Sequence, residues 1–176
     1  MNGSLVFPSI DTAPGLFGPG AVLAATGASG TTAGGTWPSA NLAIYVPLRI
    51  TRAVSVAQLT LLNGAVVSGN VDVGLMDANF VRLASAGSTA QAGTNAYQTF
   101  NITDILIGPG LYYMAVALDN TTATVFRVAS TISAEVWRAL GLAQQATAFP
   151  IPSVGTPAVM ANNYLPLVGL DTLGTF

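Results

Sequence analysis

The stretch NVDVGLMDANFVRLASAG, residues 70–87, most constrains the fold, because apolar and polar residues alternate on both sides of a short turn. Alternation with a period of two places successive side chains on opposite faces of a β-strand. Asp77-Ala78-Asn79 supplies turn-forming residues between the two runs. The stretch therefore predicts a β-hairpin. Its first strand is expected to be half-buried, with Asp72 on the face opposite Val71 and Val73.

Similar runs continue from about residue 41 to residue 130, and Gly, Asn, Asp or Pro separates most of them. The predicted strands are 41–48, 54–62, 71–77, 80–85, 97–103, 111–118 and 122–129. Both faces of 111–118 are apolar, which is typical of a strand that is covered on both sides. Short strands at this spacing predict an all-β fold, an antiparallel β-sandwich or jelly roll.

Both ends of the chain combine apolar residues with repeated proline, which disfavours long helices and central strands. We expect an extended N-terminal arm over residues 1–40, a β-sandwich body over 41–140 and an extended C-terminal arm over 141–176. Within the body, residues 133–140 fit a short helix, and an eighth strand is the alternative. The arms are expected to lie on neighbouring subunits, so that deletion of 148–176 abolishes assembly but leaves the body folded. The arm residues expected at the interface are Leu5, Phe7, Leu16, Phe17, Phe149, Ile151, Tyr164 and Leu165.

The chain is almost uncharged, with 7% charged residues against about 25% in an average globular protein. Its surface must consist largely of small and neutral polar residues, which are cheap to desolvate against a partner. We therefore expect a subunit of an assembly, a trimer or higher cyclic oligomer, with a neutral secreted monomer as the alternative. Scattered arginines and a net charge of −2 predict no nucleic-acid binding. No apolar run of membrane-spanning length and no signal-peptide pattern is found.

The chain has few side chains of the kinds that catalyse reactions, because it contains no His and no Cys. We expect no enzyme, no catalytic residue, no cofactor and no metal site. Asp77 and Asp119 lie in predicted turns, where aspartate commonly bonds nearby backbone; calcium binding by such loops is the alternative. Among the aromatic residues, Tyr97 and Tyr112 are candidates for ligand or interface contacts, although most sandwich aromatics pack in cores. Tyr112 and Tyr113 are expected to point to opposite faces of their strand.

Residues 71–128 resemble β-sandwich modules of tailed-bacteriophage virion proteins. The likeness rests on the strand end Gly74-Leu75-x-Asp77, a Ser/Thr-Ala-Gly loop, Phe100–Thr103, and the Pro-Gly-x-Tyr-Tyr-x-Ala run that starts at Pro109. The tail from residue 141 is similar to C-terminal segments of such proteins. The resemblance implies a structural protein of the virion, assembled in the host cytoplasm with other virion proteins. It implies a head decoration (cement) protein or a tail or fibre component, and a carbohydrate-binding or host-recognition module is the alternative.

Overall fold

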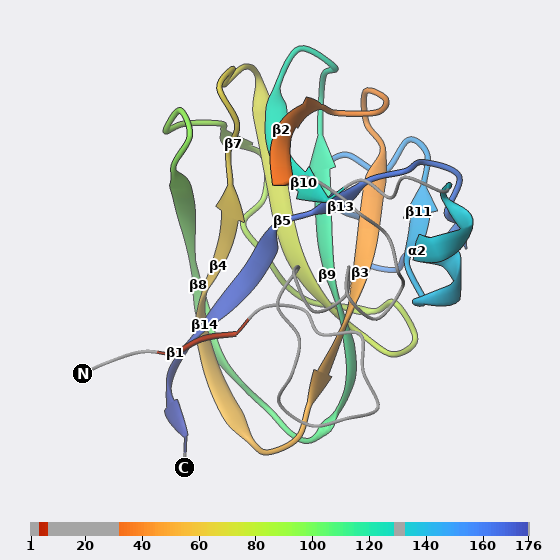
Figure 1. The fold of residues 1–176 in the computed structure, drawn as a ribbon. Helices are drawn as coiled ribbons and strands as arrows, with labels where there is room; N and C mark the ends of the chain where they lie inside the picture. The colour runs from red at the N-terminus through yellow and green to blue at the C-terminus, as the bar shows by residue number, and fades with distance from the viewer. Residues whose placement is uncertain (1–3, 7–31, 129–132, 176) are drawn as a thin grey trace.

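The computed structural model describes residues 4–6, 32–128 and 133–175, and the chain is an all-β protein (Figure 1). All seven strands predicted between residues 41 and 129 are present. The strands are β1 (Ser4–Val6), β2 (Thr32–Thr36), β3 (Ala43–Ile50), β4 (Val54–Leu62), β5 (Asn70–Asp77), β6 (Arg82–Ser85), β7 (Thr89–Ala90), β8 (Tyr97–Ile107), β9 (Gly110–Leu118), β10 (Thr124–Val128), β11 (Ala143–Gln145), β12 (Ala158–Val159), β13 (Leu165–Pro166) and β14 (Val168–Thr175).

Two antiparallel sheets form the body. One has the order β1-β14-β4-β8, and the other has the order β12-β11-β3-β9-β5-β6. Eight of these strands, β1, β3, β4, β5, β6, β8, β9 and β14, show nested pairing when taken in chain order. The first pairs with the last, the second with the seventh, the third with the sixth and the fourth with the fifth. This is the strand order of a jelly roll, so the predicted fold class is confirmed.

The main core lies between the two sheets and receives apolar side chains from both. Val73 of β5 and Val116 of β9 meet Leu59 of β4 and Leu170 of β14 there, and all four are fully buried. Strand β9 lies between β3 and β5, and its other face is buried as well, through Ala115. The expectation that this strand is covered on both sides is confirmed.

A second apolar cluster covers the outer face of the larger sheet. Tyr45 of β3 and Met76 of β5 point to this face and pack with Ala148 and Ile151 of the C-terminal segment. Asp72 is on the same face and is fully buried. The prediction of a half-buried β5 is therefore wrong, because a segment distant in sequence covers the face that was expected to be open.

The expected C-terminal arm, residues 141–176, is part of the body. Strand β11 pairs with β3, β13 pairs with β10, and β14 pairs with β4. The prolines limit much of this region to short strands, but each of these strands pairs with another strand of the chain. Pro166 lies in β13, an edge strand of the small sheet β13-β10-β2, where proline is tolerated.

The expected N-terminal arm, residues 1–40, is described only in part, since 7–31 lie outside the described residues. Strand β1 pairs with β14, and β2 pairs with β10. Trp37 is buried in the main core, and its Nε1 donates a hydrogen bond of 3.0 Å to the carbonyl oxygen of Leu42. Residues 32–40 are therefore part of the body, and the expected boundary at residue 40 does not separate an arm from it.

Residues 133–140 take the helical alternative. Helix α2 (Glu135–Ala139) buries Trp137, and Glu135 and Arg138 lie at its two ends as a helix dipole favours. Gly141 ends the helix with φ = 85°. Its N–H donates to the carbonyl of Arg138, and the N–H of Leu142 donates to that of Trp137, both at 2.9 Å. These two bonds form a Schellman C-cap.

Candidate ligand-binding site

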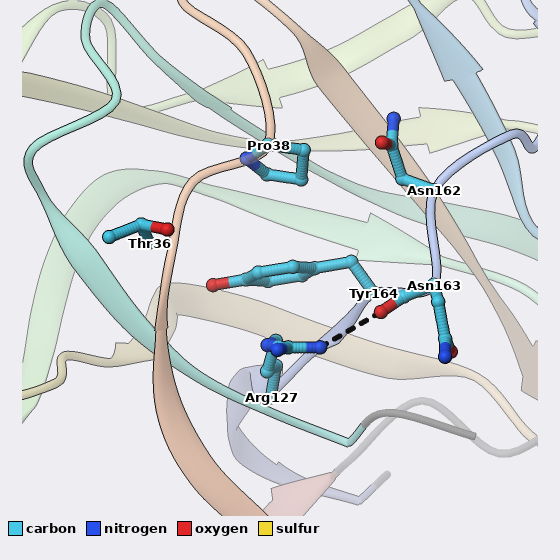
Figure 2. A pocket seen from close by; sticks show the side chains of 6 residues that line it. All are labelled: Thr36, Pro38, Arg127, Asn162, Asn163 and Tyr164. Carbon is cyan, nitrogen blue, oxygen red and sulfur yellow. Dashed lines mark hydrogen bonds between the residues drawn. The ribbon is translucent and has the colours of Figure 1, made fainter. Parts of the chain in front are cut away.

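An open depression lies over the small sheet β13-β10-β2 and the loop that precedes β13 (Figure 2). Its volume is about 370 Å³. Antiparallel pairing of β10 with both β2 and β13 brings residues together that are far apart in sequence. The depression is lined by Thr36, Pro38, Arg127, Asn162, Asn163 and Tyr164.

Tyr164 forms the fixed floor of the depression. Its hydroxyl lies 2.7 Å from the carbonyl oxygen of Gly35 and 3.0 Å from that of Val125, so its one proton is shared between these two acceptors. Its ring meets the ring of Trp37 edge-to-face at a centroid distance of 5.2 Å. Burial raises the pKa of Tyr164 well above its ordinary value of 10.0, while the charge of Arg127 lowers it in part. The phenol therefore remains a neutral donor at physiological pH.

Arg127 supplies the positive charge of the site. Its guanidinium carbon lies 4.9 Å from the centroid of the Tyr164 ring, a cation–π arrangement. Its Nη1 donates a hydrogen bond of 2.9 Å to the carbonyl oxygen of Asn163 (Figure 2). The side chain of Asn163 is held in turn, because its Oδ1 accepts a hydrogen bond of 2.6 Å from Trp137 Nε1.

The remaining lining groups are neutral. Thr36 is exposed at the end of β2, and Asn162 is oriented by a hydrogen bond of 2.9 Å from its Nδ2 to Gln144 Oε1. A fixed cation, a hydroxyl and an amide can together recognise a polar anionic ligand. No carboxyl group is among the described residues that line the depression, which offers hydrogen-bonding groups and one positive charge.

Three aspartates in the described part of the chain serve the fold. Asp72 is buried beneath the C-terminal segment. Asp77 Oδ1 accepts hydrogen bonds from the backbone N–H groups of Asn79 (2.8 Å) and Val81 (2.9 Å), as the turn interpretation predicts. Asp119 Oδ1 accepts a hydrogen bond of 3.0 Å from the backbone N–H of Asn70. Within the described ranges, no three or more His, Cys, Asp or Glu side chains gather where they could hold a metal.

The residues expected at a C-terminal arm interface lie inside this chain. Ile151, Tyr164 and Leu165 are buried, with Ile151 only 1% exposed, and Phe149 packs against the second apolar cluster. Their assignment to contacts with a neighbouring subunit is therefore corrected, because their apolar surface is already covered. The backbone of Leu5 in β1 pairs with that of Asp171 in β14. Three further expected residues, Phe7, Leu16 and Phe17, lie outside the described residues.

The two tyrosines proposed for ligand contacts differ in exposure. Tyr97 at the start of β8 is 52% exposed. Tyr112 packs against the main core, and its hydroxyl donates a hydrogen bond of 3.0 Å to the carbonyl of Gly108. Tyr113 points to the opposite face and stacks on Phe80 at a centroid distance of 4.3 Å, so the expected opposite orientation is confirmed.

Sequence reasoning missed Arg127 and Asn162 as site residues. Arg127 lies in an ordinary alternating strand, and nothing in its neighbourhood distinguishes it from the other scattered arginines.

No family model, no curated protein and no solved structure matches the chain. None of the helices in the described residues is long and apolar enough to span a membrane.

Proposed function

We propose that this chain is a non-enzymatic structural subunit of a bacteriophage virion, either a head decoration (cement) protein or a tail or fibre component. The proposal rests chiefly on the jelly-roll strand order, an architecture that builds viral capsid domains and lectin domains. Because one fold hosts many functions, two further supports are needed. These are the likeness of residues 71–128 to virion modules and the low charge of the surface.

The surface carries few charged side chains. The sequence has five arginines and seven acidic residues, and Asp72 is buried. Arg82 and Arg138 donate to the backbone carbonyls of Ile151 and Met160, and both side chains remain exposed and charged. A surface of this kind loses little hydration energy when another chain covers it, as permanent interfaces within a particle require.

We assign the assembly contacts to the surface of the body, because the C-terminal segment is used by the chain's own core. Apolar side chains that remain exposed are the candidates, and Leu106 and Val159 are the most exposed of them at 70% and 68%. Each Å² of apolar surface buried in the assembly contributes about 25 cal/mol. Among the side chains that the structure describes, the exposed large apolar ones are Val66, Val81, Leu83, Tyr97, Leu106, Leu111, Val154 and Val159.

The direct test is quantitative and cross-linking mass spectrometry of purified particles of the phage that encodes the chain. We expect a fixed copy number, cross-links between copies, and lower incorporation of Leu106→Ser. Thr103→Ser, an exposed position on the same strand, is the matched control and should incorporate normally. A chain that is abundant in infected cells and missing from purified particles would overturn the proposal.

A carbohydrate-binding role is the second candidate, and the depression around Arg127 together with exposed Tyr97 favours it. Exposed aromatic rings and neutral hydrogen-bonding groups are common in polar ligand sites. Binding on a glycan array that is lost in Tyr97→Ala would support this role. Tyr112→Ala is a less selective probe, because that ring also packs against the core.

A further inference from the structure

We propose that the depression around Arg127 binds the carboxylate of an acidic saccharide, such as a uronic acid. The inference deepens the second candidate function, carbohydrate binding, by naming the residue that selects the ligand and the class of sugar it selects. It depends on the placement of one guanidinium group and on the chemistry of the residues beside it.

Arg127 is held in place before any ligand arrives. Its guanidinium lies over the ring of Tyr164 and donates to the carbonyl of Asn163. Gly35 of the paired strand β2 leaves room for the side chain, because a Cβ there would clash with Arg127 Nε. A guanidinium fixed in this way loses little conformational freedom when it binds a ligand.

No carboxyl group is among the described residues that line the depression. The hydrogen bond that Arg127 makes in this part of the chain goes to a neutral carbonyl, that of Asn163. A single backbone carbonyl accepts from one of its nitrogens, whereas the guanidinium has five N–H donors. A carboxylate is the group that fits two parallel donors of this planar fork.

The neutral lining favours a sugar over other carriers of a carboxylate. The hydroxyl of Thr36 and the amide of Asn162 flank the depression and suit the hydroxyl groups of a saccharide. Half-buried Pro38 offers an apolar ring surface (Figure 2), and the wide mouth of the depression can accommodate the end of an oligosaccharide.

The test compares three small probes by titration of the ¹⁵N-labelled full chain, followed by NMR. D-glucuronate carries the sugar ring and the carboxylate, D-glucose carries the ring alone, and N-acetylglycine carries a carboxylate as a peptide terminus does. We expect glucuronate to bind at the depression about tenfold or more tightly than either of the others, the ratio that one charged hydrogen-bonded contact typically gives.

Three variants locate the site. Arg127→Ala should weaken glucuronate binding by about tenfold or more. Gly35→Ala should weaken it comparably although every charge is retained, since the added Cβ displaces the guanidinium. Arg52→Ala removes an exposed arginine outside the depression and should bind as the unaltered chain does. The ¹⁵N spectrum of each variant reports whether it is folded.

Thr36→Val keeps the β-branched shape in β2 and removes only the hydroxyl, so it provides a test if Arg127→Ala does not fold. It should weaken binding of glucuronate severalfold. Equal binding of glucose and glucuronate, tighter binding of N-acetylglycine, no binding at all, or unchanged affinity in folded variants at residues 35, 36 and 127 would each overturn the proposal. Its failure would leave the particle experiment unaffected, because that experiment measures incorporation of the chain and not ligand binding.

Discussion

The carboxylate of Asp72 accepts a hydrogen bond of 2.9 Å from the backbone N–H of Ile151, seventy-nine residues further along the chain. The hydroxyl of Ser85 bonds to the same carboxylate, at 2.8 Å from Oδ1 and 3.0 Å from Oδ2. Arg82 donates to the carbonyl oxygen of Ile151. Side chains of β5 and β6 thus bond both the N–H and the carbonyl of Ile151, and this fixes the C-terminal segment on the outer face of the sheet.

The buried Asp72 makes stability depend on pH. Burial raises the pKa of Asp72 above 3.8, while hydrogen bonds from Ser85 and Ile151 and the charge of Arg82 lower it in part. Because the folded-state pKa exceeds that of the unfolded chain, this group's contribution is fully present below pH 3.8 and is lost as the pH rises through the folded pKa. We expect the free energy of unfolding of the unaltered chain, relative to that of Asp72→Asn, to increase as the pH falls from 7 to 4.

Urea unfolding of both chains at several pH values measures this difference, and the subtraction removes groups that the two chains share. Asp119→Asn is an informative control. The pKa of Asp119 is lowered, since hydrogen bonds from Asn120 and Asn70 together outweigh its desolvation. Its contribution is present above the unfolded pKa and is lost in acid, so the trend relative to Asp119→Asn should have the opposite sign. Equal slopes for both variants would contradict this account.

Ile151 tests whether the C-terminal segment stabilises its own chain. Its side chain is buried in the cluster with Tyr45 and Met76, and truncation of a buried isoleucine costs about 3 kcal/mol. Ile151→Ala should therefore lower the free energy of unfolding of the isolated chain by roughly that amount, measured by urea titration. Val159→Ala, in exposed β12 of the same segment, should change it by less than about 0.5 kcal/mol. If both substitutions had similarly small effects, the C-terminal segment would not stabilise its own chain, and the expectation of an arm that is buried only against other chains would hold.

Deletion of residues 148–176 should unfold the body, contrary to the expectation from sequence. The deletion removes Met160, Tyr164 and Leu170 from the main core and strips β14 from its place between β1 and β4. Circular dichroism should show loss of a cooperative thermal transition, and the NMR spectrum should lose its dispersion. A truncated chain that keeps both would show that residues 1–147 fold without the C-terminal segment.

The parts of the fold that sequence predicts well are those encoded locally. Residues 71–77 and 111–118 reveal strands because alternation or a continuous apolar run is bounded by turn residues. The opposite orientations of Tyr112 and Tyr113 follow from the same two-residue period. Six of the eight nested strands of the jelly roll are predicted in this way, whereas the other two, β1 and β14, lie in segments that the sequence predicts to be arms.

Contacts between distant segments could not be predicted from sequence. Nothing near Asp72 indicates that Ile151 will cover it. The prolines of residues 148–170 suggest an extended arm, because the sequence shows their effect on the local backbone. It does not show the distant strands with which the short strands of this segment pair. The depression is hidden for the same reason: Thr36, Arg127 and Tyr164 are brought together only by the pairing of β2, β10 and β13.

Tyr45 should make the fold sensitive to alkali. Burial raises its pKa to about 12, and its hydroxyl donates a hydrogen bond of 2.8 Å to Gln145 Oε1. Because the folded pKa exceeds the unfolded value of 10.0, the contribution of Tyr45 is present below pH 10 and is lost as the pH rises through 12. In urea unfolding, the unaltered chain should lose more stability between pH 9 and pH 11 than Tyr45→Phe does. At pH 7 the variant should be about 1 kcal/mol less stable, the usual effect of one lost hydrogen bond. Parallel alkaline profiles for the two chains would show that Tyr45 ionises as readily in the folded state as in the unfolded chain.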